Sequence, residues 1–524
     1  MPMQPTYPGV YVQEVPSGVR TITGVATSIT AFVGRALRGP VNEPTTITSY
    51  SDYKRSFGGL SIDSTMSYAV RDFYLNGGSI AIIVRIINGA KEAKISLPAG
   101  SLNLPDNFLN LYASSPGAWG DKLSVEVNYN TTDQTAPSTL DPDLFNLIIY
   151  YDGVKIEEHL NVTLKETEVS YLPRILQQNS GFITIEKDST GNWIVPQTRP
   201  SAIITPLKAS PGSDGYDLTP AQYQGSESDK EGIYALIKTD LFNLLCIPPP
   251  TRLADTDPTV YTKAMKLCVD KRAMLLVDSP YAWGNSPVTA ISNAISGLTT
   301  LGLSGNEARN AALYFPRVKQ ADPNRKQQLD TFVPCGIISG IFARTDSDRG
   351  VWKSPAGIEA TLSGITGLQV NLTDDENGQL NPLGINCLRS FPVTGSVVWG
   401  ARTLRGADQF ADEYKYIAVR RTALFIEESL FRGTQWIVFE ANDEPLWSQI
   451  RLNVGAFMHD LFIQGAFHGQ SPKDAYFVKC DKETTTQNDI NQGIVNIWVG
   501  FAPLKPAEFV ILHIQQIAGQ INNK

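Results

Sequence analysis

The sequence lacks the short motifs that mark the common nucleotide-dependent and hydrolytic enzymes. It contains no GxSxG, GxGxxG or HExxH motif and no Gly-Lys pair, so the nucleophile elbow, the dinucleotide fingerprint, the zinc-protease helix and the P-loop are all missing. Only four histidines occur, and His459 and His468 are nine residues apart, whereas two metal ligands on one helix face are three or four apart. We therefore predict no catalytic residue, no metal ligand and no cofactor, and a protein that is not an enzyme.

Positive charge is also scarce. The chain has 44 Lys and Arg residues against 52 Asp and Glu residues, which gives a formal net charge of −8. A protein that binds the phosphate backbone of nucleic acid usually shows a basic excess or a run of Lys and Arg residues. The composition therefore predicts no direct contact with nucleic acid.

Long hydrophobic runs and paired cysteines are absent as well. Residues 80–87 are among the most apolar, but the run is short and contains Arg85, and no basic segment followed by an apolar one opens the chain. Neither a membrane span nor a secretory signal is predicted, so we expect assembly in the cytoplasm and no membrane insertion. The five cysteines are dispersed without a CxxC spacing, which predicts reduced and mostly buried thiols.

What the chain does contain is the alternating pattern of an α/β protein. At 524 residues it is too long for one core and should divide into roughly two to four domains. Residues 27–35 predict a buried strand, residues 67–75 a helix with an apolar stripe, and residues 80–86 a second strand. This β–α–β order is typical of parallel sheets. Later segments repeat it, with strands predicted at 241–250, 271–280 and 310–318 and helices at 262–273 and 291–303.

Two other regions depart from that pattern. Between 91 and 205, short apolar runs alternate with turn-forming residues, which predicts a β-rich insertion. Beyond residue 371 the acidic stretch 374–378 is predicted to be a solvated turn rather than a cation site, since no spaced EF-hand pattern follows. This last region is predicted to hold helices at 414–431 and 444–464 and strands at 435–440, 475–481, 494–501 and 508–516.

Both ends of the chain carry an isolated strand pattern. Residues 10–15 form the short run VYVQEV between Pro8-Gly9 and Pro16-Ser17-Gly18, with no hairpin partner beside it. Residues 507–516 are apolar on both strand faces, as expected of a strand that is buried on both faces. Two interpretations remain open. Both strands join a sheet of their own chain, or their unpaired edges pair with another chain.

Seven blocks of the sequence, taken together and in order, resemble the contractile tail sheath family. This family comprises the sheaths of contractile phages, R-type pyocins and related contractile injection systems. The first block is YPGVYVQEVPSG and the last is VGFAPLKPAEFVILHIQQ. The blocks occupy residues 7–18, 27–59, 115–127, 342–357, 380–404, 426–443 and 499–516.

The resemblance implies an α/β multidomain fold built on a subtilisin-like α/β domain that lacks the catalytic triad. A C-terminal α+β inner domain would face a tube, and the β-rich insertion would form an outer domain. Extended arms would flank both ends. The implied divisions are 1–20 for the N-terminal arm, 21–90 with 206–370 for the α/β domain, 91–205 for the insertion, 371–505 for the inner domain and 506–524 for the C-terminal arm.

The resemblance also implies the function of a structural sheath subunit. Copies would stack as six-membered rings around an inner tube protein, contact baseplate and terminal cap proteins, and contract by rigid-body rearrangement to drive the tube through a target envelope. Assembly would take place in the bacterial cytoplasm before the subunit becomes part of a phage tail or injection particle. A hydrolase on the same scaffold and another assembly protein, such as a capsid or surface-layer subunit, are the alternatives.

The resemblance assigns roles to four groups of residues. The inter-subunit arm strand would be Val10, Tyr11, Val12, Gln13, Glu14 and Val15, with hinges at Gly9, Pro16 and Gly18. The C-terminal strand partner would be Phe509, Val510, Ile511, Leu512, His513 and Ile514. The polar edge of the helix at 444–464 would face the tube through Gln449, Arg451 and Asn453, although this helix could equally be packed core.

Overall fold

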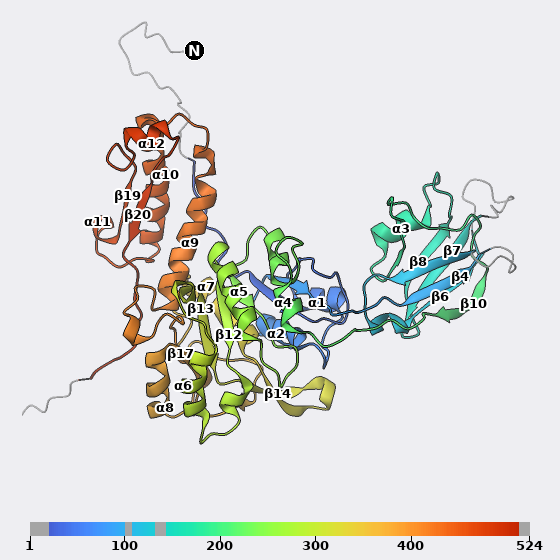
Figure 1. The fold of residues 1–524 in the computed structure, drawn as a ribbon, viewed down its shortest axis with the longest axis horizontal. Coiled ribbons are helices and arrows are strands. Elements are labelled where there is room, and N and C mark those ends of the chain that lie inside the picture. Colours follow the sequence, from blue (N-terminus) through green and yellow to red (C-terminus); the bar gives the residue numbers. More distant parts are fainter. Residues whose placement is uncertain (1–19, 100–106, 132–142, 513–524) are drawn as a thin grey trace, which may run out of the picture. The chain divides into compact units, whose positions relative to one another are not determined.

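The computed structural model describes residues 20–99, 107–131 and 143–512 of the chain. These residues form two compact units (Figure 1). The larger unit comprises Ser28–Arg344 and Ala356–Asp412, and the smaller unit comprises the residues up to Thr27, Thr345–Pro355 and the residues from Glu413 onward.

A twisted eight-stranded sheet forms the centre of the larger unit, in the order β18-β17-β13-β12-β11-β1-β3-β2. Its six inner strands run parallel, and the two edge strands β2 and β18 are antiparallel to their neighbours. The predicted β–α–β order is confirmed, because β1 and β3 pair in parallel. The strands are β1 (Thr30–Gly34), β2 (Thr45–Ile47), β3 (Ala81–Arg85), β11 (Leu244–Cys246), β12 (Met274–Asp278), β13 (Ala311–Phe315), β17 (Ile385–Phe391) and β18 (Gly395–Val398).

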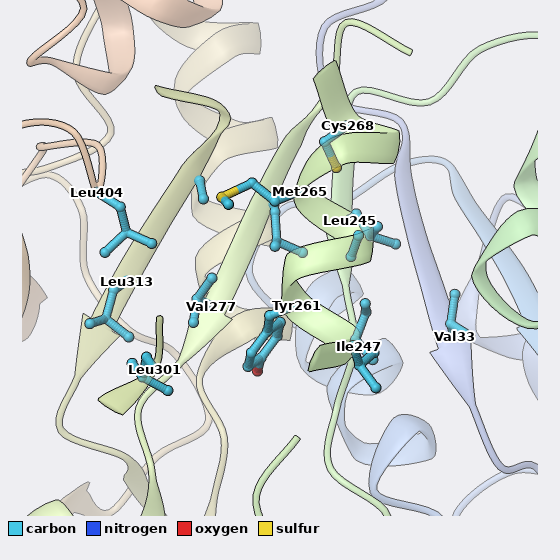
Figure 2. Packing of buried hydrophobic residues seen from close by; sticks show 14 of the residues in the cluster. Val33, Leu245, Ile247, Tyr261, Met265, Cys268, Val277, Leu301, Leu313 and Leu404 are labelled. Atoms are coloured by element: carbon cyan, nitrogen blue, oxygen red, sulfur yellow. The ribbon is translucent and has the colours of Figure 1, made fainter. Parts of the chain in front are cut away.

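Helices bury the faces of this sheet. Figure 2 shows Tyr261, Met265 and Cys268 of α5 packed toward the strand residues Leu245 and Val277, all of them buried. All five cysteines are free and buried, as predicted. The helices of this unit are α1 (Tyr50–Phe57), α2 (Thr65–Leu75), α4 (Pro220–Gln224), α5 (Pro258–Asp270), α6 (Ala290–Thr300), the greater part of α7 (Cys335–Arg349) and α8 (Asp374–Leu380). A further small sheet contains β14 (Val318–Asp322), β15 (Gln328–Phe332) and β16 (Gly367–Leu368).

The region between 91 and 205 is β-rich, as predicted. It contains a three-stranded sheet of order β4-β5-β9 and a four-stranded sheet of order β10-β6-β7-β8, which share one apolar core. Burial alternates along β6 because every second residue faces that core, and this alternation made the strand predictable from the sequence. The elements are β4 (Lys94–Pro98), β5 (Phe108–Ala113), β6 (Leu123–Asn128), β7 (Phe145–Tyr151), β8 (Val154–Val162), α3 (Leu172–Asn179), β9 (Ile183–Ile185) and β10 (Ile203–Lys208).

Two predictions about residues 371–412 are corrected by the structure. The acidic stretch 374–378 is not a turn but the start of α8, where Thr373 and Glu376 form a capping box and three carboxylates occupy the helix N-terminus. The boundary predicted at residue 371 lies later, because β17 and β18 extend the main sheet of the larger unit. A strand pattern alone does not reveal which sheet its strands join.

The smaller unit is built on two long helices. Helix α9 (Ile417–Gly433) and helix α10 (Glu444–Ile463) confirm the helices predicted at 414–431 and 444–464, and β19 lies along α10 (Figure 1). Their buried faces share a core with β19 (Tyr476–Lys479) and β20 (Trp498–Phe501). The short helices α11 (Pro472–Ala475) and α12 (Gln487–Asn491) complete the unit. In the part of the chain that is described, no helix is both long and apolar enough to span a membrane.

The strand predicted at 435–440 is wrong. Gln435–Ile437 form the short 3-10 helix η8, and a tight turn follows it. The apolar run QWIVFE has the composition of a strand, but α9 ends at Gly433 and α10 begins at Glu444. The chain must reverse within these ten residues, so turn geometry overrides local β propensity.

A buried ion pair ties three segments of the smaller unit together. The Arg421 guanidinium donates to both carboxylate oxygens of Asp346, at 2.8 and 2.5 Å, and to the carbonyl of Thr27 at 2.9 Å. The hydroxyl of Thr27 donates to the same carboxylate at 2.7 Å. Both charged side chains are only 4% exposed. This bidentate ion pair and the two hydrogen bonds to Thr27 together provide partners for most of the polar atoms of Arg421 and Asp346, which burial would otherwise leave unpaired.

Candidate functional site

The smaller unit carries a sheet of only two strands. β19 and β20 are antiparallel, with Tyr476 opposite Phe501 and Lys479 opposite Trp498. Within the described residues no further strand pairs with either outer edge. A two-stranded sheet is marginal on its own, and its unpaired N–H and C=O groups can accept another strand.

The two faces of this sheet differ in burial. Tyr476, Val478, Val499 and Phe501 pack against the core of the smaller unit. On the opposite face, Phe477 is 50% exposed and Trp498 is 61% exposed. The sheet is therefore anchored on its inner face and exposed on its outer face. Apart from an isolated bridge between Phe467 and Pro503 just beyond β20, no strand among the described residues covers its edges.

The first described residues of the chain are fixed to this unit. The backbone N–H of Arg20 donates to the Oδ1 of Asn453 at 3.0 Å, and its guanidinium lies 4.6 Å from the ring centroid of Trp436. Ile22 is buried against Gly433, where an added Cβ would lie 2.5 Å from the Ile22 side chain. Arg20 and Ile22 are thus fixed near the C-terminal end of α9. We call Arg20 and Ile22 the arm root.

The predicted arm strand Val10–Val15 and the hinges Gly9, Pro16 and Gly18 lie outside the described residues. Their roles remain predictions. Sequence reasoning missed the arm root, because Arg20 and Asn453 are 433 positions apart and neither residue type in its local context signals the contact.

The C-terminal segment leaves the unit at the other end of α9. The hydroxyl of Tyr416, which precedes α9, donates to Glu508 at 3.1 Å. Because α9 has 17 residues, its ends are about 25 Å apart, so the arm root and Glu508 lie at opposite ends of one helix.

Residues 509–512 are exposed in the single chain. Phe509, Val510, Ile511 and Leu512 are between 73% and 80% exposed, and residues 507–512 have no regular secondary structure. Of the two interpretations left open for this segment, a strand in a sheet of its own chain is therefore not observed over these residues, and pairing with another chain stays a prediction. His513 and Ile514 lie outside the described residues.

The three polar residues predicted to face the tube do not share one surface. Gln449 is exposed, but Arg451 is half-buried and binds the Cys480 carbonyl and the Glu444 carboxylate, the latter at 2.6 Å. Asn453 is buried at the arm root, which corrects its assignment as a surface residue. Successive positions on a helix are 100° apart, so residues two apart point in different directions. The exposed face of α10 instead presents Leu452 and Ile463.

Two titratable groups of this region have a raised pKa. Burial raises the pKa of the Cys480 thiol to about 11, so this cysteine stays protonated at neutral pH. Burial, with Asp460 nearby, also raises the pKa of Tyr476. The described residues contain no group of three or more His, Cys, Asp and Glu side chains that could hold a metal ion. The site therefore has the features of a binding surface, with apolar side chains and free backbone groups.

Known protein families match both units. The family model "Phage tail sheath protein central domain" matches residues 241–404, and "Phage tail sheath C-terminal domain" matches residues 411–517. Together they cover more than half of the chain. The second match begins close to Glu413, where the smaller unit resumes.

Several curated proteins are similar in sequence. The tail sheath protein of Burkholderia phage BcepMu is 24% identical over 475 residues, which cover 88% of this chain and 87% of the relative. The tail sheath protein of Vibrio phage KVP40 is 28% identical over 202 residues, or 37% of this chain and 28% of the relative. A putative prophage major tail sheath protein of Pseudomonas aeruginosa is 29% identical over 174 residues, or 32% and 42%. The matched part thus spans less than half of the latter two relatives.

Solved structures share the mixed α/β multidomain fold. The contracted sheath of the extracellular contractile injection system PVC aligns with a TM-score of 0.58 at 21% identity, covering 98% of this chain and 99% of that one. The contracted helical sheath of the anti-feeding prophage aligns with a TM-score of 0.56 at 23% identity, covering 98% and 100%. From the family models and the sequence relatives we conclude that the chain belongs to the contractile tail sheath family, whose members are structural proteins and not enzymes.

Proposed function

We propose that this chain polymerises into a contractile sheath whose copies are linked by exchange of terminal strands. The observation that carries the proposal is the combination of an open two-stranded sheet and an exposed apolar segment on the same unit. The N-terminal strand at residues 10–15 and the C-terminal strand at residues 509–514 would pair with the β19–β20 sheets of neighbouring copies. Each sheet would then gain the strands that its own chain does not supply.

The energetics favour exchange only in a large assembly. A six-residue strand forms a few backbone hydrogen bonds worth about 0.5–1.5 kcal/mol each. Burial of Phe509 or Ile511 adds roughly 1.5–3 kcal/mol each, whereas ordering the free segment costs about 1–2 kcal/mol per residue. One exchange is therefore weak, and many simultaneous exchanges reinforce one another through high effective concentration. Subunits would stay unassembled until a baseplate and an inner tube provide a template.

The positions of the arm root and Glu508 support linkage in two directions. The arm root lies at the C-terminal end of α9, and Glu508 lies beside Tyr416 at the N-terminal end. Each copy would thus offer one strand at each end of a rigid helix. This geometry suits stacked rings, for which we propose six copies per ring.

Contraction would be a rigid-body change between two helical packings, in which the strands keep their pairing and Gly9, Pro16 and Gly18 act as hinges. The extensively buried sheet of the larger unit suits a body that moves without deforming. The free energy would come from better packing between copies in the contracted state, with no nucleotide involved. The driven inner tube would then cross the target envelope.

For the remaining partners we propose an inner tube protein, baseplate proteins and terminal cap proteins, met in the bacterial cytoplasm during assembly. A chain with this fold has been solved in the baseplate of the anti-feeding prophage. For the tube contact we propose the exposed face of α10, with Gln449, Leu452 and Ile463 in place of the buried Asn453.

The proposal is tested by deletion of residues 1–15 in cells that produce the complete particle. We expect a folded subunit that no longer forms sheaths, scored by negative-stain microscopy of particles. A matched variant, Tyr11→Pro, keeps the arm length but removes one ladder donor, and it should impair assembly, whereas Gln4→Pro, outside the proposed strand and hinges, should have little effect. Normal striated sheaths from the deletion variant would show that strand exchange is wrong, and flat lattices or shells from the intact chain would show that the sheath assignment is wrong.

A further inference from the structure

A tight turn between α9 and α10 holds Phe439 in a backbone conformation that phenylalanine rarely adopts. Val438 has φ −63° and ψ 126°, Phe439 has φ 71°, and the Glu440 N–H donates to the Ile437 carbonyl at 3.0 Å. These values describe a type II β-turn, whose third position favours glycine because a side chain is disfavoured at positive φ. Phe439 is the only aromatic residue with positive φ in the described part of the chain.

The side chain of Phe439 gains no compensating burial within its own chain. Phe439 is fully exposed, at 104%, and Val438 beside it is 64% exposed. The base of the turn is nevertheless well held, since Asn442 donates to the Ile494 carbonyl at 3.0 Å and accepts from Trp447 Nε1 at 2.9 Å. The turn thus presents two apolar side chains from a fixed base. Strained backbone conformations of this kind persist mainly at functional positions.

We propose that Phe439, with Val438, is an interface residue that a second copy of the chain covers in the assembled sheath; this inference rests on the proposed function. The turn lies beside the arm root, because Arg20 stacks on Trp436 only three residues before Phe439. The proposed arm strand ends at Val15, five positions before Arg20, so a copy that binds this strand would lie within reach of the turn. An apolar projection that enters a different surface of the next copy is a heterologous contact, the type that builds helical assemblies. Exposed aromatic side chains are also frequent anchors of protein interfaces.

Two substitutions at position 439 distinguish the effect of the strained backbone from the effect of the aromatic side chain. Phe439→Gly relieves the strained φ, and the exposed ring contributes no burial to the folded subunit, so the purified subunit should melt about 2 °C higher. The same variant should form at least about tenfold fewer sheaths in particle-producing cells, because the anchor is lost. Phe439→Ala keeps the strain and removes the ring, so it should lose assembly without the gain in melting temperature.

A matched control is available elsewhere on the chain. Val393, in the turn between β17 and β18, is 98% exposed, and Val393→Ser should leave both sheath yield and melting temperature unchanged. The partner is identified by a photo-reactive phenylalanine analogue at position 439 in full-length protein. The expected product in assembled sheaths has twice the mass of the chain.

Several results would overturn the inference. They are normal sheath yield from Phe439→Gly, a lower melting temperature for that variant, an equal loss of assembly by Val393→Ser, or cross-linking only to a different tail component. The arm deletion distinguishes this inference from strand exchange. If the arm deletion assembles normally while Phe439→Gly does not, strand exchange fails and the Phe439 interface stands.

Discussion

The two sheets of this protein illustrate two ways of using β structure. In the larger unit, β1, β3, β12 and β13 are buried at every residue, and helices and further strands complete their surroundings. In the smaller unit, β19 and β20 are partly exposed along their whole length and form a ladder with each other alone among the described residues. The first sheet is completed by its own chain. The second has apolar surface and backbone groups left for a partner.

Removal of the C-terminal segment should have the largest effect, which is the loss of sheath formation, and it tests the proposed difference between the two sheets. Deletion of residues 509–524 keeps the Glu508 contact and removes Phe509–Leu512, which are exposed in the single chain, so the melting temperature of the purified subunit should change by less than about 1 °C. Sheath formation should be lost, because the open sheets of neighbouring copies would lack a strand. Removal of only the last three residues is the control and should assemble normally. A large drop in melting temperature would mean that the segment stabilises its own chain.

Truncation of a core aromatic in the larger unit should have the next largest effect. Phe73 on α2 is fully buried, and its ring centroid lies 5.7 Å from that of Phe32 on β1. Phe73→Ala should destabilise the subunit by about 3–5 kcal/mol, measured by chemical denaturation. Leu75→Ala on the same helix is the matched control, because Leu75 is half exposed and should cost less than about 1 kcal/mol. Similar costs for both would contradict the burial described for α2.

Substitution of Arg421 and Asp346 tests how much the buried ion pair between them stabilises the smaller unit. Arg421→Leu should cost about 3 kcal/mol, because the Asp346 carboxylate would remain buried without its partner. The double variant Arg421→Leu, Asp346→Leu should be more stable than the single variant, since no uncompensated charge remains. A double-mutant cycle by denaturant unfolding measures the coupling. Additive losses would show that the two side chains act independently.

The smallest effect concerns a buried carboxyl group at the end of β12. Asp278 accepts a hydrogen bond from the Cys335 N–H at 3.0 Å, and burial raises the pKa of Asp278 to about 6. Because this pKa is above the ordinary value near 4, the contribution of Asp278 to stability is fully present below pH 4 and is lost as the pH rises through 6.

Asp278→Asn should remove this pH dependence. The stability of the wild type relative to the variant should fall by up to about 3 kcal/mol between pH 4 and pH 8, with most of the change between pH 4 and 6. Thermal unfolding of both proteins across this range measures the difference. An unchanged difference across the range would show that the carboxyl group is not protonated in the folded state near pH 5.

Much of the larger unit could be predicted because each of its segments has a strong local pattern. The apolar runs that became β11, β12 and β13 end at or near prolines. In the smaller unit, the helices α9 and α10 were likewise predictable from the sequence. Errors arose where tertiary context overrides the local pattern. The run QWIVFE became a short helix and a turn because only ten residues separate two long helices, and residues 385–398 joined a sheet whose other strands lie far away in the sequence.

The candidate interface was predictable only in part. The apolar C-terminal segment and the short N-terminal strand were visible as patterns without partners. The arm root was not, because Arg20, Trp436 and Asn453 meet only after α9 and α10 have packed. Asn453 is a second residue whose environment the sequence did not reveal. Its polar side chain predicted an exposed position, but the side chain is buried in the structure.

The sequence alone determined the class of protein: an α/β chain without the motifs of an enzyme, with an apolar strand pattern near each end and no partner for it nearby in the sequence. These features are local, because they depend on residue types and on spacing over a few turns or strands. Only the tertiary structure decided which surfaces stay open. The unpaired edges of β19 and β20, the anchored arm root and the exposed Phe439 depend on contacts between residues that are distant in the sequence, and hydrophobic spacing carries no information about those contacts.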